Sequence, residues 1–161
     1  KLGHAPVAIQ LLDRSLFHTG GKAAGFVLLG EAWTRVEVPE AEKARQAWKL
    51  ADQFEPDSAL RQRVAEGYRK LGDTVEAQRQ TGLGQYQAGK TLWLKNDLVS
   101  AAVRFEEAAR LVPDHAATWF YLGEIRRLQG DKPAAESAFR RCLALNPDHG
   151  RALSALERLR Q

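Results

Sequence analysis

The sequence predicts an all-α fold made of repeated antiparallel helix pairs, and three observations carry this prediction. When residues 82–115 are aligned with residues 116–149, Phe105 falls on Phe139 and the Pro-Asp-His triplet at 113–115 falls on the one at 147–149. Inside each unit the apolar residues recur at helical spacing, and no stretch alternates as a half-buried strand would. Self-similarity at a period of this length is typical of stacked helical repeats.

Length and composition are those of an ordinary soluble chain. It has 161 residues, of which 44% are apolar and 27% charged, enough for one compact unit or one repeat array. The net charge of +4 is spread along the chain, which argues against nucleic acid as a partner. Apolar runs of only a few residues exclude a transmembrane helix, so no membrane insertion is expected. The one cysteine, Cys142, excludes an internal disulfide and leaves a cytoplasmic and a periplasmic location both open.

The first residues predict an array that begins inside a helix pair. Leu2-Gly3 is typical of the end of one helix, and the pair Ala8 and Leu12 predicts the next helix. The chain starts with Lys1 and contains no Met, so we expect it to be a piece of a longer protein. The absence of a signal peptide then carries no information.

A full helix pair is predicted over residues 23–57, with about two extra residues near Val38-Pro39. Residues 58–73 predict one further first helix, which ends at the turn Gly72-Asp73. The next turn, Asn96-Asp97, comes sooner than the spacing of the later turns predicts, so ten residues of a second helix are missing. Residues 74–95 therefore form either one long helix or two helices that break at 81–84. This irregular segment predicts possible sub-blocks 1–73 and 74–161 within a single array over 1–161.

The last two units, 82–115 and 116–149, are the most regular part of the sequence. Each consists of a first helix, a turn at Asn96-Asp97 or Gly130-Asp131, a second helix and a closing proline. Small residues such as Gly89 and Gly123 allow helix axes to approach within about 8–10 Å. One helix pair cannot cover its own apolar face, so neighbouring pairs are expected to stack.

These residues resemble the tetratricopeptide repeat, whose pattern is a large aromatic, then Leu-Gly, then a small residue four before another aromatic, then a closing proline. Residues 116–149 follow it most closely, and the resemblance extends over nearly all of the chain. It implies a right-handed superhelical array of antiparallel helix pairs. The matching positions of residues 116–149 are Trp119, Leu122, Gly123, Ala135, Phe139 and Pro147.

Residues 84–91 match the phosphate-binding pattern G-x-x-x-x-G-K-T letter for letter. That motif needs a preceding strand that delivers a glycine loop to a helix N-terminus. Here the preceding residues 74–80 are polar and helical in pattern, and Gly89 already serves as a helix-contact residue. We therefore expect no nucleotide site and no cofactor.

The remaining reactive residue types give no catalytic or metal site. His115 and His149 occupy the same position of successive repeats, so a helix-packing distance separates them, whereas metal bonds are about 2.1 Å long. The serines have no recognisable base and orienting acid. Cys142 lies at a small-residue core position and is expected to be inert. The sequence thus predicts a protein that is not an enzyme and holds no metal.

In this family, first-helix residues that face away from the second helices line a concave groove. The resemblance places a mixture of aromatic and charged residues on this face of the C-terminal part: Tyr86, Lys90, Trp93, Phe120, Glu124 and Arg127. Such a mixture is typical of a groove for a peptide or a partner helix. The pattern that holds a chaperone C-terminus by a carboxylate clamp is not matched.

The resulting hypothesis is a non-catalytic scaffold that binds a protein or peptide partner in its groove. The alternative is an accessory repeat domain of a larger enzyme or of a secretion or assembly machine. A third option is a structural array that associates with itself through its ends.

Overall fold

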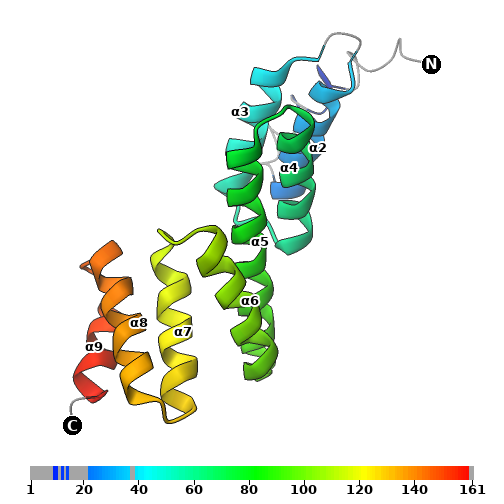
Figure 1. Cartoon of the computed structure of the whole chain (residues 1–161). Coiled ribbons are helices and arrows are strands. Elements are labelled where there is room, and N and C mark those ends of the chain that lie inside the picture. Colours follow the sequence, from blue (N-terminus) through cyan, green and yellow to red (C-terminus); the bar gives the residue numbers. More distant parts are fainter. Residues whose placement is uncertain (1–8, 11, 13, 15–21, 37–38, 160–161) are drawn as a thin grey trace. The chain divides into compact units, whose positions relative to one another are not determined.

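The computed structural model describes residues 9–10, 12, 14, 22–36 and 39–159. Within these residues the chain is helical and contains no strand, in agreement with the predicted all-α class (Figure 1). Leu2-Gly3, Ala8 and Val38 lie outside the described residues. The helices are α2 (Ala23–Thr34), α3 (Ala41–Asp52), α4 (Ser58–Lys70), α5 (Thr74–Leu94), α6 (Leu98–Leu111), α7 (Ala116–Leu128), α8 (Lys132–Leu145) and α9 (Gly150–Leu159).

Residues 74–94 form one helix, α5, of 21 residues, so the alternative with a break at 81–84 is wrong. The two glycines in this stretch do not interrupt the helix, although glycine costs about 1 kcal/mol relative to alanine in a helix interior. Gly82 has a packing reason, since a Cβ there would lie 2.5 Å from a methyl group of Val112. The chain divides into two compact units between Thr81 and Gly82, inside α5.

Unit 1, residues 1–81, is built around the indole of Trp48 in α3. The ring is buried, lies 4.8 Å from the ring of Tyr68, and donates a hydrogen bond from Nε1 to the carbonyl oxygen of Val27 at 3.4 Å. Neighbouring core residues come from α2, α3, α4 and the start of α5: Val27, Ala44, Ala51, Val64, Tyr68 and Ala77. A buried aromatic side chain removes roughly 150–250 Å² of surface from water, more than any aliphatic neighbour in this cluster.

A buried polar group also belongs to unit 1. The guanidinium of Arg61 in α4 is almost fully buried and donates to Oδ1 of Asp52 at 2.8 Å and to Oε1 of Gln80 at 2.7 Å. These bonds tie α4 to the end of α3 and to α5. Because a buried charge is costly without a partner, we expect this network to fix the register of the three helices.

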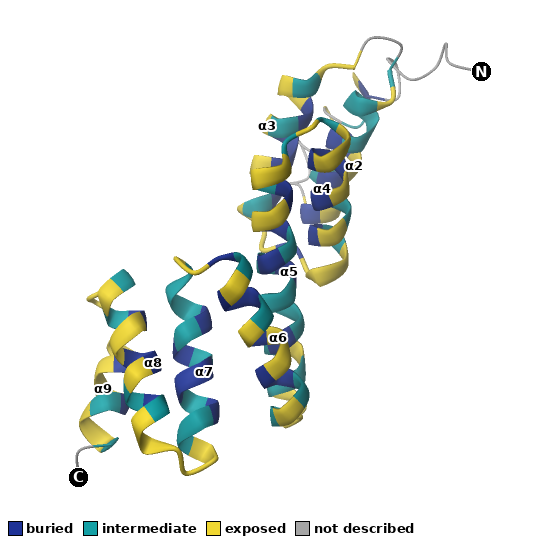
Figure 2. Cartoon of the chain, viewed as in Figure 1, coloured by how far each residue is buried: buried dark blue, intermediate teal, exposed yellow. Residues whose placement is uncertain are grey.

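Unit 2, residues 82–161, contains two aromatic core residues in equivalent positions, Phe105 in α6 and Phe139 in α8. Both are fully buried, and the buried faces of the helices turn toward one another (Figure 2). Phe105 packs against Ile125 and Leu122 of α7, while Phe139 packs against residues of α9. Stacking thus continues from one helix pair to the next, as expected for a repeat array.

The turns inside the helix pairs share one geometry. Gly72, Asn96 and Gly130 have positive φ angles of 77°, 61° and 83°. The aspartate that follows each of them accepts a hydrogen bond from a backbone N–H three residues later and begins the next helix. Hydrogen bonds from Ser100 hold the pKa of Asp97 below its usual value. Only glycine and a few polar residues adopt this left-handed conformation readily. For this reason each turn could be predicted from a glycine or asparagine followed by an aspartate.

Candidate partner-binding site

The six predicted groove residues all lie in unit 2, three in α5 and three in α7. The half-buried phenol of Tyr121 connects the two helices, because its ring lies 5.6 Å from that of Trp93 and 6.0 Å from that of Tyr86. Trp93 and Tyr86 are themselves half-buried. The aromatic residues of α5 therefore keep part of their surface open to a partner while their inner edges pack against α7.

Lys90 and Tyr86 form a cation–π contact one helical turn apart. The ammonium nitrogen lies 5.5 Å from the ring centroid, within the distance at which such contacts stabilise. On its other side the Tyr86 ring meets the imidazole of His115 edge-on at 4.5 Å. The α5 part of the surface thus combines an aromatic ring and a cation in a fixed arrangement.

The prediction that Phe120 is an exposed groove aromatic is wrong. Its side chain is only 3% exposed, because the ring packs 6.0 Å from Phe139 and 5.0 Å from the imidazole of His149. Helix α9 supplies the cover through Ala152 and Ala155, which belong to the same core cluster. The predicted groove included residues of α5 and α7 only, so it did not take into account that α9 packs over Phe120.

Glu124 and Arg127 pair with each other inside α7. Two guanidinium nitrogens lie 3.0 and 3.3 Å from the carboxylate oxygens, and the Glu124 side chain is only 13% exposed. The hydrogen bond to Glu124 raises the pKa of Arg127. The carboxylate of Glu124 therefore partly neutralises the charge of Arg127, although both residues were predicted to bind a partner.

The surface of α7 continues onto α9 across a hollow of about 330 Å³, lined by Phe120, Glu124, Gly150, Arg151, Ser154 and Arg158. Arg158 also lines a second hollow of about 340 Å³, together with Arg127, Gly130, Lys132 and Leu159. The α9 residues were missed by the sequence interpretation. In the repeat register Phe120 and Glu124 correspond to Ser154 and Arg158, so the same alignment could have found them.

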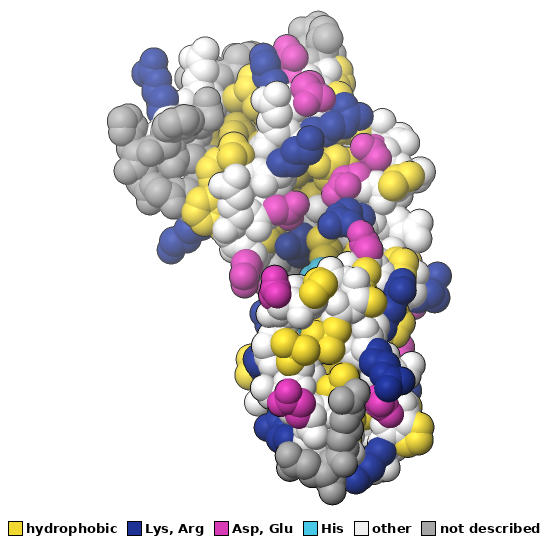
Figure 3. Space-filling model, turned by 90° about the vertical axis from the view of Figure 1, so that its left-hand side faces the viewer, with side chains coloured by type: hydrophobic (Ala, Val, Ile, Leu, Met, Phe, Trp, Pro, Cys, Tyr) yellow, Lys and Arg dark blue, Asp and Glu magenta, His cyan; other side chains and the backbone are white. Residues whose placement is uncertain are grey.

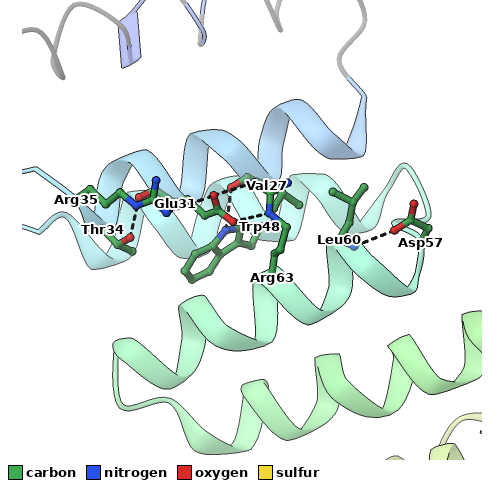
Figure 4. Close-up of polar contacts among 8 residues, drawn as sticks. All are labelled: Val27, Glu31, Thr34, Arg35, Trp48, Asp57, Leu60 and Arg63. Atoms are coloured by element: carbon green, nitrogen blue, oxygen red, sulfur yellow. Dashed lines mark hydrogen bonds and ion pairs between the residues drawn. The ribbon is translucent and has the colours of Figure 1, made fainter.

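Unit 1 has its own groove, of about 770 Å³, between α2 and α4. Glu31 of α2 spans it to Arg63 of α4 through two hydrogen bonds of 2.8 Å each, which raise the pKa of Arg63 (Figure 4). Arg35 also approaches Glu31, at 4.0 Å, and Arg69 pairs with Glu66 at 3.1 Å. Both carboxylates of this groove are thus already bound by arginines of the same groove.

The segment that resembles a phosphate loop is helical throughout, since residues 84–91 lie within α5. Its backbone therefore has no glycine loop that could surround a phosphate, and the ring of Phe105 packs against Gly89. Cys142 is fully buried, and burial raises the pKa of its thiol. In the described part of the chain, no group of three or more His, Cys, Asp or Glu side chains could hold a metal ion.

Residues 116–149 match the family model of the tetratricopeptide repeat. They comprise α7, the turn at Gly130, and α8, and they repeat the pattern of residues 82–115. The chain thus contains a tetratricopeptide repeat. Among the described residues, no helix of the chain is both long and apolar enough to cross a membrane.

Two further comparisons find proteins that are similar to this chain. Over 123 residues, or 76% of the chain, it is 31% identical to cellulose synthase operon protein C of Xanthomonas axonopodis pv. citri. The aligned part is only 8% of that protein's length, so the chain corresponds to a small piece of it. It is also similar to the crystal structure of YrrB, described as a TPR protein with an unusual peptide-binding site, at 17% identity and a TM-score of 0.46, over 97% of this chain and 85% of that one.

Proposed function

We propose that this chain is a non-catalytic scaffold segment that binds a protein partner on one surface of unit 2. This surface, called here the α5–α7–α9 surface, consists of Tyr86, Lys90, Trp93, Glu124, Arg127 and the α9 residues Arg151, Ser154 and Arg158. One observation carries the proposal: half-buried aromatic rings lie beside cationic side chains on the neighbouring helices α5 and α7. Aromatic and arginine side chains supply most of the binding energy at protein interfaces.

Peptide display gives an unbiased test of this proposal. Random peptides are selected on the full 161-residue chain, and the selected peptides are then tested on the variant Trp93→Ala with Arg127→Ala. We expect most of them to lose binding. A matched control, Trp33→Ala with Arg140→Ala, removes the same residue types outside the surface and should retain binding.

Trp93 also packs against Tyr121, so its removal affects stability as well as binding. A second variant, Lys90→Glu with Arg127→Glu, reverses the charge at two half-buried positions and keeps the aromatic side chains, although it removes the Lys90–Tyr86 contact and the Arg127–Glu124 ion pair. Loss of binding in this variant, with the helical circular dichroism spectrum retained and a single cooperative melt, supports the proposal. If both variants still bind the selected peptides, the binding surface lies elsewhere on the chain.

A second candidate function is favoured by the similarity to a much longer protein. The aligned piece of cellulose synthase operon protein C is 8% of that chain, which supports the alternative of an accessory repeat segment in a larger machine. The test is to introduce Lys90→Glu with Arg127→Glu into the full-length parent protein. If the parent still assembles with its other components and only one partner is lost, the segment is a recruiting surface. If assembly fails altogether, its role is structural.

A further inference from the structure

We propose that the hollow between α7 and α9 binds an acidic segment of the partner, with one carboxylate on Arg151 and another on Arg158. This inference rests on the proposed function and names the chemistry that one part of the same surface recognises. Both arginines lie on one face of α9, along with Ser154, and line the same hollow as Phe120.

The first argument is that these two arginines have no partner of opposite charge among the residues that the structure describes. Within the described part of the chain, neither guanidinium has a carboxylate at ion-pair distance, whereas Arg127, Arg126, Arg110 and Arg140 of the same unit each have one. Arg151 instead lies over the ring of Phe120, at 4.5 Å from its centroid. A flat aromatic support holds the guanidinium in place and leaves its N–H groups free for a carboxylate.

The second argument is the balance of charge around the hollow. Four cations and one carboxylate line this hollow and the adjoining one, and the carboxylate, Glu124, is bound by Arg127. In the groove of unit 1, by contrast, each of the two carboxylates is bound by an arginine of that groove. An acidic ligand would displace internal ion pairs in unit 1, whereas in unit 2 it would meet two arginines that have no carboxylate partner among the described residues.

The third argument comes from geometry. Arg151 is in the first turn of α9, where the helix dipole also favours negative charge. Arg158 lies seven residues later, a separation of roughly 10 Å along the helix axis. A peptide in the polyproline II conformation rises about 3.1 Å per residue with three residues per turn, so carboxylates three residues apart lie on one side at about that distance and can each pair with one arginine.

A protein segment fits these features better than a nucleic acid does. The cations form a small group that includes a carboxylate, and the chain as a whole carries a net charge of only +4. Nucleic-acid surfaces instead present a continuous basic stripe. In Figure 3 the face of unit 2 turned to the viewer mixes hydrophobic side chains with separate basic and acidic ones and shows no such stripe.

Fluorescence anisotropy of a labelled short peptide tests the inference on the full 161-residue chain. The probe carries glutamate at every third position, with glycine and serine between, and its matched control has glutamine in place of each glutamate. We expect the glutamate peptide to bind and the glutamine peptide not to bind. Arg151→Gln with Arg158→Gln should weaken binding about tenfold, the effect of losing two partly exposed charge-assisted contacts.

Two further variants separate a specific site from general attraction. Arg140→Gln with Arg141→Gln makes the same change of net charge on α8, outside the hollow, and should leave the affinity within about twofold. Glu124→Gln removes the carboxylate that competes for Arg127 and should tighten binding several-fold. Equal weakening in the α8 variant, or equal binding of the glutamine peptide, would overturn the inference.

Other occupants are also outcomes of the test. A single-stranded DNA oligonucleotide is tested in the same assay. If it binds more tightly than the glutamate peptide, and if the Arg151→Gln, Arg158→Gln variant does not bind it, the ligand of this hollow is a nucleic acid and the inference is wrong. Peptides selected by display that need Trp93 and Arg127 but contain no acidic residues would refute this inference and leave the proposed function standing. If display yields no peptide that depends on the α5–α7–α9 surface, the proposed function itself fails.

Discussion

The ring of Phe139 fills the space that a side chain on Gly123 would need, since a Cβ there would lie 2.5 Å from Cε1 of that ring. The pair Gly89 and Phe105 has the same arrangement in the preceding repeat, at 2.8 Å. In both cases the glycine belongs to the first helix and the aromatic to the second. The close approach of the two helices thus depends on a complementary pair, and neither member can change alone.

Gly123→Ala should destabilise unit 2. The added methyl group must push the Phe139 ring away from a well-packed position, which typically costs about 1–3 kcal/mol. Chemical denaturation followed by circular dichroism measures this loss. Gly150→Ala is the matched control, because a Cβ on Gly150 meets open space and alanine has the higher helical propensity, so this variant should keep its stability or gain some; an equal loss there would contradict the steric explanation.

Phe139→Ala and Phe105→Ala should each lower the free energy of unfolding by about 3–5 kcal/mol, because each removes a fully buried ring and leaves a cavity. Val99→Ala is a suitable control, as its side chain is 75% exposed. Thermal melts of the three variants give the comparison. A melting curve unchanged by either phenylalanine substitution would contradict the repeat register described above.

Asp131→Ala should destabilise α8 by about 0.5–2 kcal/mol, since the carboxylate accepts a hydrogen bond from the backbone N–H of Ala134 at 3.0 Å. Asp131→Asn keeps an acceptor oxygen and should retain most of this stability. Hydrogen exchange at the first turn of α8 measures the local effect. Similar exchange rates for Asp131→Ala and the unchanged chain would rule out a capping role.

The thiol of Cys142 should react slowly in the folded chain. Its side chain is fully buried and its pKa is raised by burial, so both access and the thiolate fraction are reduced at neutral pH. Reaction with a chromogenic disulfide reagent should become fast only after denaturant is added. Complete reaction of the native chain within the mixing time would show that α8 opens readily.

Lys90 should not act as a nucleotide ligand, despite its place in a sequence that matches the phosphate-loop pattern. It lies inside α5 and faces the ring of Tyr86. Calorimetric titration of ATP with magnesium should therefore give no saturable heat. A saturable heat that disappears in Lys90→Ala would instead assign this segment to phosphate binding.

The helical class, the turns and the core aromatics can all be predicted from the order of the residues alone. These features depend on local chemistry: positive φ angles require residues such as Gly72, Asn96 and Gly130, and a following aspartate caps the next helix. Phe105 and Phe139 could be predicted as core residues because the repeat places them at equivalent, helix-facing positions. A repeat carries the same local information several times, which makes these assignments unusually clear in a single sequence.

The tertiary structure decided the features that depend on neighbours distant in sequence. The continuity of α5 follows from packing such as that of Gly82 against Val112, which outweighs the low helical propensity of glycine. Likewise, Phe120 has the repeat position of a groove residue but is buried, because α9 and His149 cover its ring. Position in a repeat indicates which way a side chain points, whereas exposure depends on the helix that packs next to it.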